Sequence, residues 1–196
     1  MTNQALTLVA GGTGKTGRRG VERLKARGIP VRVGSRAASP RFDWDDPRTW
    51  APALSGVTAV YLAYHPDLAY PGAAQKIAEF AALAEAAGVR RVVLLSGRGE
   101  EAAHAAERGV RESGMAWTVL RSAWLNQNFD EGEFAGAVRA GVIALPAGDV
   151  AEPFVDAGDI ADVAVAALTE PGHDGRIYEL TGPRLLTFAE VAEEIG

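Results

Sequence analysis

Short apolar runs alternate with longer segments of helical spacing along most of the sequence. The apolar runs cover residues 5–10, 30–34, 57–63, 91–96 and 116–121. Continuous apolar runs are typical of strands that are buried on both faces, as in a parallel sheet. Helix-length segments lie between the runs at residues 16–27, 71–87 and 100–113, and glycines follow the last two, where helices commonly end. This alternation predicts right-handed βαβ units and an α/β fold with a doubly wound parallel sheet flanked by helices.

Further segments complete the expected order of elements. Residues 41–44 predict a short third strand, residues 159–168 a further helix, and residues 176–180 a late strand followed by a turn at 181–183. Thr187 and Glu190 have the spacing of a capping box, which predicts the start of another helix. The sequence reaches Gly196 about two helical turns later.

Composition and charge exclude several classes of protein. The 196 residues contain no cysteine, which rules out disulfides, thiolate catalysis and cysteine-ligated metals. The net charge of −5 argues against a nucleic-acid-binding surface. No apolar run is long enough to span a membrane, and no basic segment precedes the first apolar run as in a signal peptide. His65, His104 and His173 are too scattered to predict a metal site. We therefore expect a cytoplasmic protein without nucleic-acid or membrane partners.

A glycine-rich segment follows the first apolar run. Residues 6–17 read LTLVAGGTGKTG and contain the pattern Gly11-x-x-Gly14-x-x-Gly17 between an expected strand and an expected helix. In a Rossmann-type fold such glycines allow a tight turn, the approach of a pyrophosphate, and close packing of helix on strand. The helix N-terminus would offer free N–H groups and a positive dipole to the phosphates. A glycine-rich turn without a ligand is the alternative. A P-loop would need a glycine where Val9 stands.

The end of the second apolar run indicates which dinucleotide is bound. Folds specific for NAD usually place an acidic residue there to hold the ribose hydroxyls. This sequence has Val33-Gly34-Ser35-Arg36 instead, and Lys15 adds another positive charge nearby. An arginine can pair with a 2′-phosphate through a charge-assisted fork. The segment therefore favours NADP(H) over NAD(H), unless Arg36 is only a solvated loop residue.

These and later motifs together resemble the NmrA-like type of atypical short-chain dehydrogenases. The resemblance runs from residue 5 to the end and rests on segments 11–17, 42–50, 54–57, 113–121, 124–129, 159–163 and 178–183. That family includes NAD(P)H-dependent quinone reductases, isoflavone-reductase-like enzymes and catalytically inert redox sensors. Most of its members are longer, with a C-terminal region that closes over the substrate pocket. The resemblance thus implies one NAD(P)-binding domain at residues 1–196, with the start of a small, cut-off substrate region from about residue 122.

The resemblance also implies which residues contact the cofactor, all at the carboxyl ends of strands. The glycine loop would hold the pyrophosphate, and residues after the later strands would contact adenine, the nucleotide groove and nicotinamide. The expected set is Gly11, Gly12, Thr13, Gly14, Lys15, Thr16, Gly17, Arg36, Asp43, Trp44, Ala63, Tyr64, His65, Ser96 and Gly97. Trp44 could instead be a packing residue, because tryptophan is often part of a core.

The usual catalytic pair of short-chain dehydrogenases is missing. Their Tyr-x-x-x-Lys motif lies on the helix after the fifth strand, where residues 100–108 contain no tyrosine. His104 and Arg108 have the same spacing, so they would share a helix face. An imidazole could donate a proton near neutral pH, and an arginine could hold ribose or phosphate. His104 could equally be a polar residue on a half-exposed helix. Glu107 is expected to be solvated or to contact ribose.

The sequence supports an enzyme more strongly than a binding protein. We expect an NADP(H)-dependent oxidoreductase that transfers hydride to a quinone or similar small carbonyl acceptor, because such a reduction does not require a protein acid. Asn126, Gln127, Asn128 and Phe129 are the candidate substrate residues. The alternative is a catalytically weak NADP(H)-binding redox sensor that acts through a protein partner. A sugar-nucleotide epimerase is disfavoured by the missing tyrosine. A monomer and a homodimer are both compatible with the sequence.

Overall fold

A computed structural model describes residues 5–132 and 134–196 of the chain. Its centre is a six-stranded parallel sheet with the strand order β2-β1-β3-β4-β5-β7. These strands are β1 (Leu6–Ala10), β2 (Val31–Gly34), β3 (Val57–Leu62), β4 (Arg91–Gly97), β5 (Ala116–Ser122) and β7 (Arg176–Leu180). The chain moves from β1 to one side, then returns to continue on the other side from β3. The prediction of a Rossmann-type doubly wound sheet is confirmed, with its topological switch point between β1 and β3.

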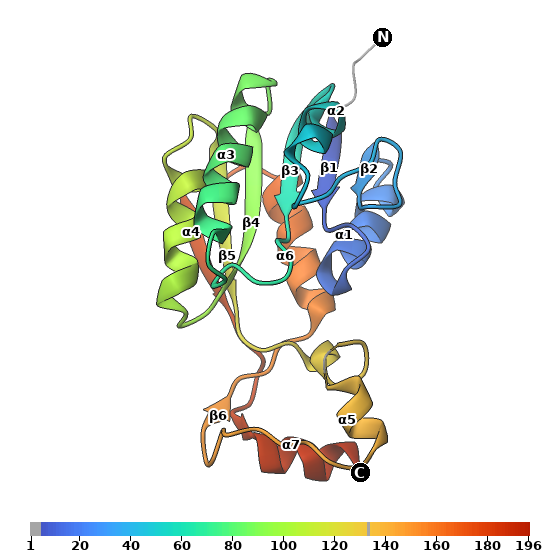
Figure 1. Cartoon of the computed structure of the whole chain (residues 1–196), viewed down its shortest axis with the longest axis vertical. Helices are drawn as coiled ribbons and strands as arrows, with labels where there is room; N and C mark the ends of the chain where they lie inside the picture. The colour runs from blue at the N-terminus through green and yellow to red at the C-terminus, as the bar shows by residue number, and fades with distance from the viewer. Residues whose placement is uncertain (1–4, 133) are drawn as a thin grey trace.

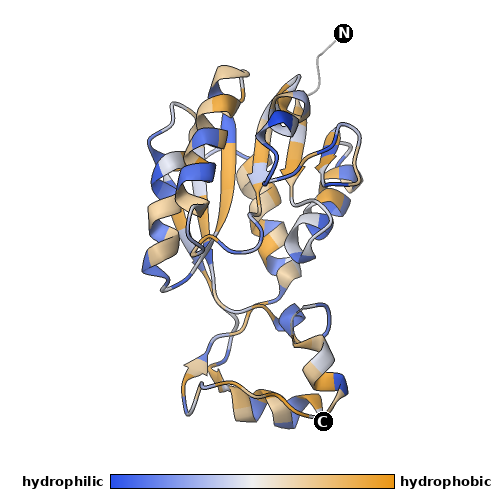
Figure 2. Cartoon of the chain, in the orientation of Figure 1, coloured by the Kyte–Doolittle hydropathy of each residue, from blue (hydrophilic) through white to orange (hydrophobic). Residues whose placement is uncertain are grey.

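Two layers of helices cover the sheet, as Figure 1 shows. On one face α1 (Lys15–Ala26) packs against α6 (Ala157–Thr169), and on the other α3 (Ala73–Ala86) packs against α4 (Glu101–Arg111). Neighbouring strand residues such as Leu8 and Val9 point to opposite faces and are both fully buried, one in each core. Figure 2 shows the resulting apolar strands between helices with polar outer faces. The continuous apolar runs are thus explained by burial on both sides.

The strand expected at residues 41–44 is not formed. This stretch is irregular and leads into a 3-10 turn, Pro47–Thr49, and the short helix α2 (Trp50–Leu54). The Asp43 carboxylate accepts a hydrogen bond from the backbone N–H of Asp45, and the indole of Trp50 donates to the Asp43 carbonyl at 2.9 Å. Local hydrogen bonds of this kind compete with a strand ladder. The apolar side chains at 42 and 44 are buried under α3 rather than against a strand partner.

A smaller unit lies beyond the carboxyl ends of the strands, at the bottom of Figure 1. It contains a 3-10 turn (Asn126–Asn128), α5 (Ala135–Arg139), the antiparallel pair β6 (Ala151–Glu152) and β8 (Leu186–Thr187), and α7 (Phe188–Ile195). Its core is aromatic, with Phe129, Phe154 and Phe188 in mutual edge or tilted contact. The predicted capping box is confirmed, because Thr187 and Glu190 bond reciprocally at the start of α7.

The described residues contain neither a candidate membrane span nor a candidate metal cluster. None of their helices is long and apolar enough to cross a bilayer. Within the same residues, no group of three or more His, Cys, Asp or Glu side chains is arranged to hold a metal ion.

Candidate functional site

In the glycine-rich turn between β1 and α1, three glycines lie too close to neighbouring main-chain atoms to carry side chains. Gly11 has a φ of 79°, and a Cβ there would lie 2.6 Å from the carbonyl oxygen of Ala63. A Cβ on Gly17 would overlap the Gly11 carbonyl, and one on Gly12 would lie 2.8 Å from the Val9 carbonyl oxygen. Gly14 precedes α1 without a side-chain cap, and the first turn of α1 carries no acidic residue. The turn therefore presents free N–H groups at a helix N-terminus, which suits an anionic pyrophosphate.

A cleft of about 920 Å³ runs along the carboxyl ends of the strands from this turn. It is the crevice in which open α/β sheets bind ligands. The predicted residues that line it are Gly11, Thr13, Gly14, Lys15, Thr16, Arg36, Asp43, Trp44, Ala63, Tyr64, His65, Ser96, Gly97 and Asn128. Gly12 and Gly17 do not line the cleft; they pack against main-chain atoms of Val9 and Gly11. One cleft thus brings together residues from five different strand ends.

The end of β2 carries positive charge and no carboxylate of its own. Arg36 is exposed and lines the cleft two residues after Gly34. Asp43 also faces this end. The backbone N–H of Asp45 and then the Arg41 guanidinium, 2.6 Å away, hold the pKa of Asp43 below its ordinary value. Because Asp43 is paired with Arg41, Arg36 remains available to a ligand.

Trp44 is both a packing residue and part of the cleft wall. Its side chain is 7% exposed and lies edge-on or tilted against Phe42, Trp50, Tyr64 and Phe80, with ring centroids 4.9 to 6.0 Å apart. Among the described residues no hydrogen-bond partner is found for its Nε1. The packing alternative for Trp44 therefore does not exclude contact with a nucleotide.

A buried ion pair lies behind Ser96, which lines the cleft, and sequence reasoning missed it. Glu107 on α4 has 0% of its surface exposed, so the expectation that it is solvated is wrong. Arg121 on β5 donates from Nε and Nη2 to the two oxygens of Glu107 at 2.9 and 2.8 Å, and the Ser96 hydroxyl donates to Oε1 at 2.8 Å. Burial alone would raise the pKa of Glu107, but the bonds from Arg121 and Ser96 outweigh it and lower the pKa. The pair could have been suspected from an arginine at the end of an expected strand, Arg121, and a glutamate on the preceding expected helix, Glu107.

The pair expected to be catalytic is not brought to the cleft. Neither His104 nor Arg108 lines it, and Arg108 is exposed on the surface of α4. His104 is half-buried, with no partner found for its Nε2 among the described residues. The buried face of α4, which includes Glu107, packs toward the sheet, and His104 and Arg108 lie outside that face. A catalytic role for His104 and Arg108 stays a prediction without geometric support.

The segment after β5 crosses the start of α1 and is tied to it by polar contacts. Lys15 Nζ donates to Asn128 Oδ1 at 2.6 Å. Glu131 pairs with Arg18, and with Nη2 of Arg19 at 2.7 Å. The Arg19 and Arg18 bonds lower the pKa of Glu131 to about 2. We call residues 126–132 the strap, because they connect the smaller unit to the start of α1.

The strap contacts predict a pH-dependent difference in stability. Because the folded pKa of Glu131 lies below its unfolded value, its contribution is complete above about pH 4.5 and is lost as the pH falls toward 2. Glu131→Gln should lower the melting temperature at pH 7 by roughly 2–4 °C, the equivalent of about 1 kcal/mol. The gap in melting temperature between Glu131→Gln and the wild type should shrink steadily below about pH 4.5. Thermal melts over this pH range measure it, with the exposed Glu112→Gln as control; a gap that is constant with pH would contradict it.

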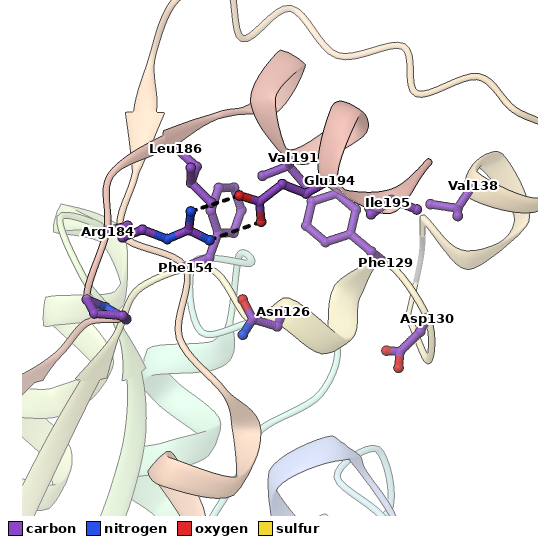
Figure 3. A pocket seen from close by; sticks show the side chains of 11 residues that line it. Asn126, Phe129, Asp130, Val138, Phe154, Arg184, Leu186, Val191, Glu194 and Ile195 are labelled. Carbon is purple, nitrogen blue, oxygen red and sulfur yellow. Dashed lines mark hydrogen bonds and ion pairs between the residues drawn. The ribbon is translucent and has the colours of Figure 1, made fainter.

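The four candidate substrate residues have different positions. Only Asn128 lines the main cleft. Asn126 and Phe129 line a second pocket of about 490 Å³ inside the smaller unit, which the Arg184–Glu194 ion pair borders (Figure 3). Gln127 is structural, because it donates to Asp156 at 2.7 Å and accepts from the backbone N–H of Ala157 at 2.8 Å. The strap end of the main cleft is instead lined by Trp124 and Phe134, which were not predicted and which stack with centroids 5.8 Å apart.

The fold and this cleft define a Rossmann-type dinucleotide-binding domain. Residues 11–171 match the family described as NAD(P)H-binding, and the chain belongs to that family. It is 35% identical to an NAD(P)H azoreductase of Xenophilus azovorans, over 97% of this chain and 73% of the relative. It is 36% identical to agroclavine dehydrogenase of Claviceps fusiformis, over 95% and 71%. An NADPH-dependent quinone oxidoreductase from Escherichia coli, solved with NADPH, shares the fold with a TM-score of 0.77 at 24% identity, over 96% of this chain and 74% of that one.

Proposed function

We propose that the chain is an NADP(H)-dependent oxidoreductase of the NmrA-like type that transfers hydride to a quinone or a similar small carbonyl acceptor. The observation that carries the proposal is the cleft, which brings the glycine turn and Arg36 together with the aromatic side chains of Trp124 and Phe134. The relatives named above include two NAD(P)H-linked or dehydrogenating enzymes at more than 30% identity. In this proposal the smaller unit, from about residue 122, serves as the substrate region of a domain spanning residues 1–196.

The nucleotide end of the cleft favours a cofactor with a 2′-phosphate. Gly11 and Gly14 line the cleft at the N-terminus of α1, which has no side-chain cap and could bind the pyrophosphate. Arg36 follows β2 where an acidic residue would otherwise hold the ribose hydroxyls of NAD(H). Its guanidinium can bind a phosphate through two parallel bonds. Trp44 and Tyr64, whose ring centroids are 5.0 Å apart, would border the adenine.

The acceptor end suits a flat, conjugated molecule. Trp124 is 37% exposed and its ring lies nearly parallel to that of Phe134, at an interplanar angle of 15°. Aromatic faces of this kind bind planar rings by offset stacking. The bound dinucleotide supplies the hydride, while the chain orients the acceptor. Of the described residues of α4 itself, Glu101–Arg111, none lines the cleft, whereas the N-cap residue Glu100 does. This suits a quinone, because its reduced oxygen can take a proton from solvent.

A turnover assay with a matched binding measurement tests the proposal. Purified protein with NADPH should reduce members of a panel of benzoquinones and naphthoquinones, followed by the loss of NADPH absorbance. Tight binding of NADPH without turnover on any acceptor would contradict the enzymatic function and favour the redox-sensor alternative. Failure to bind either dinucleotide would contradict the proposal as a whole.

Arg36→Ser tests the choice of cofactor. The substitution removes a charge-assisted bond worth about 1.5–3 kcal/mol, so the Kd for NADPH should rise roughly 10- to 100-fold while the Kd for NADH changes little. Fluorescence titration with both dinucleotides measures this. Lys25→Ser is the control, because Lys25 is exposed near the other end of α1. Tighter binding of NADH than NADPH by the wild type would overturn the NADP(H) assignment.

A further inference from the structure

Ser96, Glu107 and Arg121 form a closed hydrogen-bonded group at the centre of the fold. Ser96 and Arg121 are register partners at the carboxyl ends of β4 and β5, so their side chains point to the same face of the sheet. Helix α4 packs on that face and places Glu107 between them. Ser96 is 5% exposed and lines the cleft, whereas Glu107 is buried behind it. The group therefore reaches the cleft through a single side chain, the serine.

The hydrogen-bond donors and acceptors of this group determine how the serine can interact with a ligand. Glu107 accepts two bonds from Arg121, which has only donors to offer. A carboxylate held in this way can only accept, so the one hydroxyl proton of Ser96 points to Glu107 Oε1. The lone pairs of Ser96 Oγ remain for other partners. Toward the cleft the serine is thus a hydrogen-bond acceptor and not a donor.

We propose that the Glu107–Arg121 ion pair is a positioning device that fixes Ser96 as an acceptor for the carboxamide N–H₂ group of the nicotinamide. The inference rests on the proposed binding of a nicotinamide dinucleotide in the cleft. Glu107 and Arg121 do not touch the ligand; they act through Ser96. A serine free to rotate could bind either a donor or an acceptor, but this one discriminates between them.

A pair of nicotinamide ligands separates this arrangement from simple packing. The 3-acetylpyridine analogue of NADP⁺ replaces the N–H₂ group by a methyl group and keeps the carbonyl oxygen. The thionicotinamide analogue keeps the N–H₂ group and changes only the carbonyl. The wild type should bind NADP⁺ and the thionicotinamide analogue with similar Kd values. It should bind the acetylpyridine analogue roughly five- to tenfold more weakly, as expected for one lost neutral hydrogen bond.

Ser96→Ala removes the acceptor while leaving the ion pair in place. The variant should bind NADP⁺ roughly five- to tenfold more weakly, but its affinity for the acetylpyridine analogue should be unchanged, so the ratio of the two Kd values falls to about 1. Isothermal titration calorimetry measures both values without requiring turnover. A merely structural role for Ser96 would weaken both ligands equally and leave the ratio as in the wild type, which would overturn the inference.

The double variant Glu107→Met/Arg121→Met tests the role of the ion pair itself. Removing both partners avoids leaving a single buried charge. The released hydroxyl could then donate to the carbonyl of the acetylpyridine analogue, whose Kd should fall toward that of NADP⁺, while the Kd of NADP⁺ is retained. An unchanged ratio in a folded double variant would overturn the inference. If the variant does not fold, as judged by circular dichroism, the Ser96→Ala ratio decides.

The outcomes also separate this inference from the proposed function. Wild-type protein that binds no NADP⁺ would overturn both. Wild-type protein that binds NADP⁺ and the acetylpyridine analogue equally well would overturn only the assignment of Ser96.

Discussion

Gly17→Ala should abolish tight cofactor binding and destabilise the protein. A Cβ at this position would overlap the carbonyl oxygen of Gly11, which is main chain and cannot rotate away. Relief requires α1 to move away from the turn that would hold the pyrophosphate. Overpacking of this kind costs about 1–3 kcal/mol or more in the free energy of unfolding. We also expect the Kd for NADPH to rise at least roughly 100-fold, about 2.7 kcal/mol, as the N–H groups lose their alignment. Urea denaturation and fluorescence titration measure the two effects.

Gly20→Ala is the matched control on the same helix. A Cβ at Gly20 meets nothing within 4 Å. Because alanine favours a helix interior over glycine by about 1 kcal/mol, this variant should be as stable as the wild type or more so, with unchanged NADPH binding. Equal behaviour of the two variants would show that the close approach of Gly17 to Gly11 does not matter.

Arg121→Ala should cause the largest loss of stability of any single charge removal in the cleft region. The substitution leaves the carboxylate of Glu107 fully buried without its ionic partner. Breaking a buried pair in this way typically costs about 3–5 kcal/mol. Urea denaturation at pH 7 measures the loss. Arg98→Ala is the control, because its pair with Glu179 is 3.2 Å long with side chains 40% and 54% exposed, and it should cost at most about 1 kcal/mol.

The way in which the stability loss of Arg121→Ala depends on pH provides a second, independent check. In the wild type the lowered pKa of Glu107 means that its contribution is present above about pH 4.5 and is lost as the pH falls through the folded value. Without Arg121, burial instead favours the neutral acid. The difference between wild type and Arg121→Ala should therefore be largest near neutral pH and shrink in acid. A difference that grows as the pH falls would contradict the assignment of Glu107 as an ionised, buried group.

The sequence predicts the sheet and the close-packed glycine turn well, because both depend on local patterns. Continuous apolar runs report burial on two faces, and the glycine spacing reports a turn that only glycine can form. The strand expected at 41–44 fails because the carboxylate of Asp43 and the indole of Trp50 satisfy the backbone locally. The Glu107–Arg121 pair and the strap depend on residues far apart in sequence, which no periodicity marks. Trp124 and Phe134 were missed for the same reason.

The pairing of β5 with β7 has a consequence for how the molecule folds. Thr118 pairs with Arg176, and the chain between these strands contains the 3-10 turn, α5 and β6 of the smaller unit. Closing this long loop costs more chain entropy than pairing β3 with β4 or β4 with β5. Pairings of high sequence separation also slow folding. The part of the cleft lined by Trp124 and Phe134, which lie between β5 and β7, is therefore completed when the last strand docks.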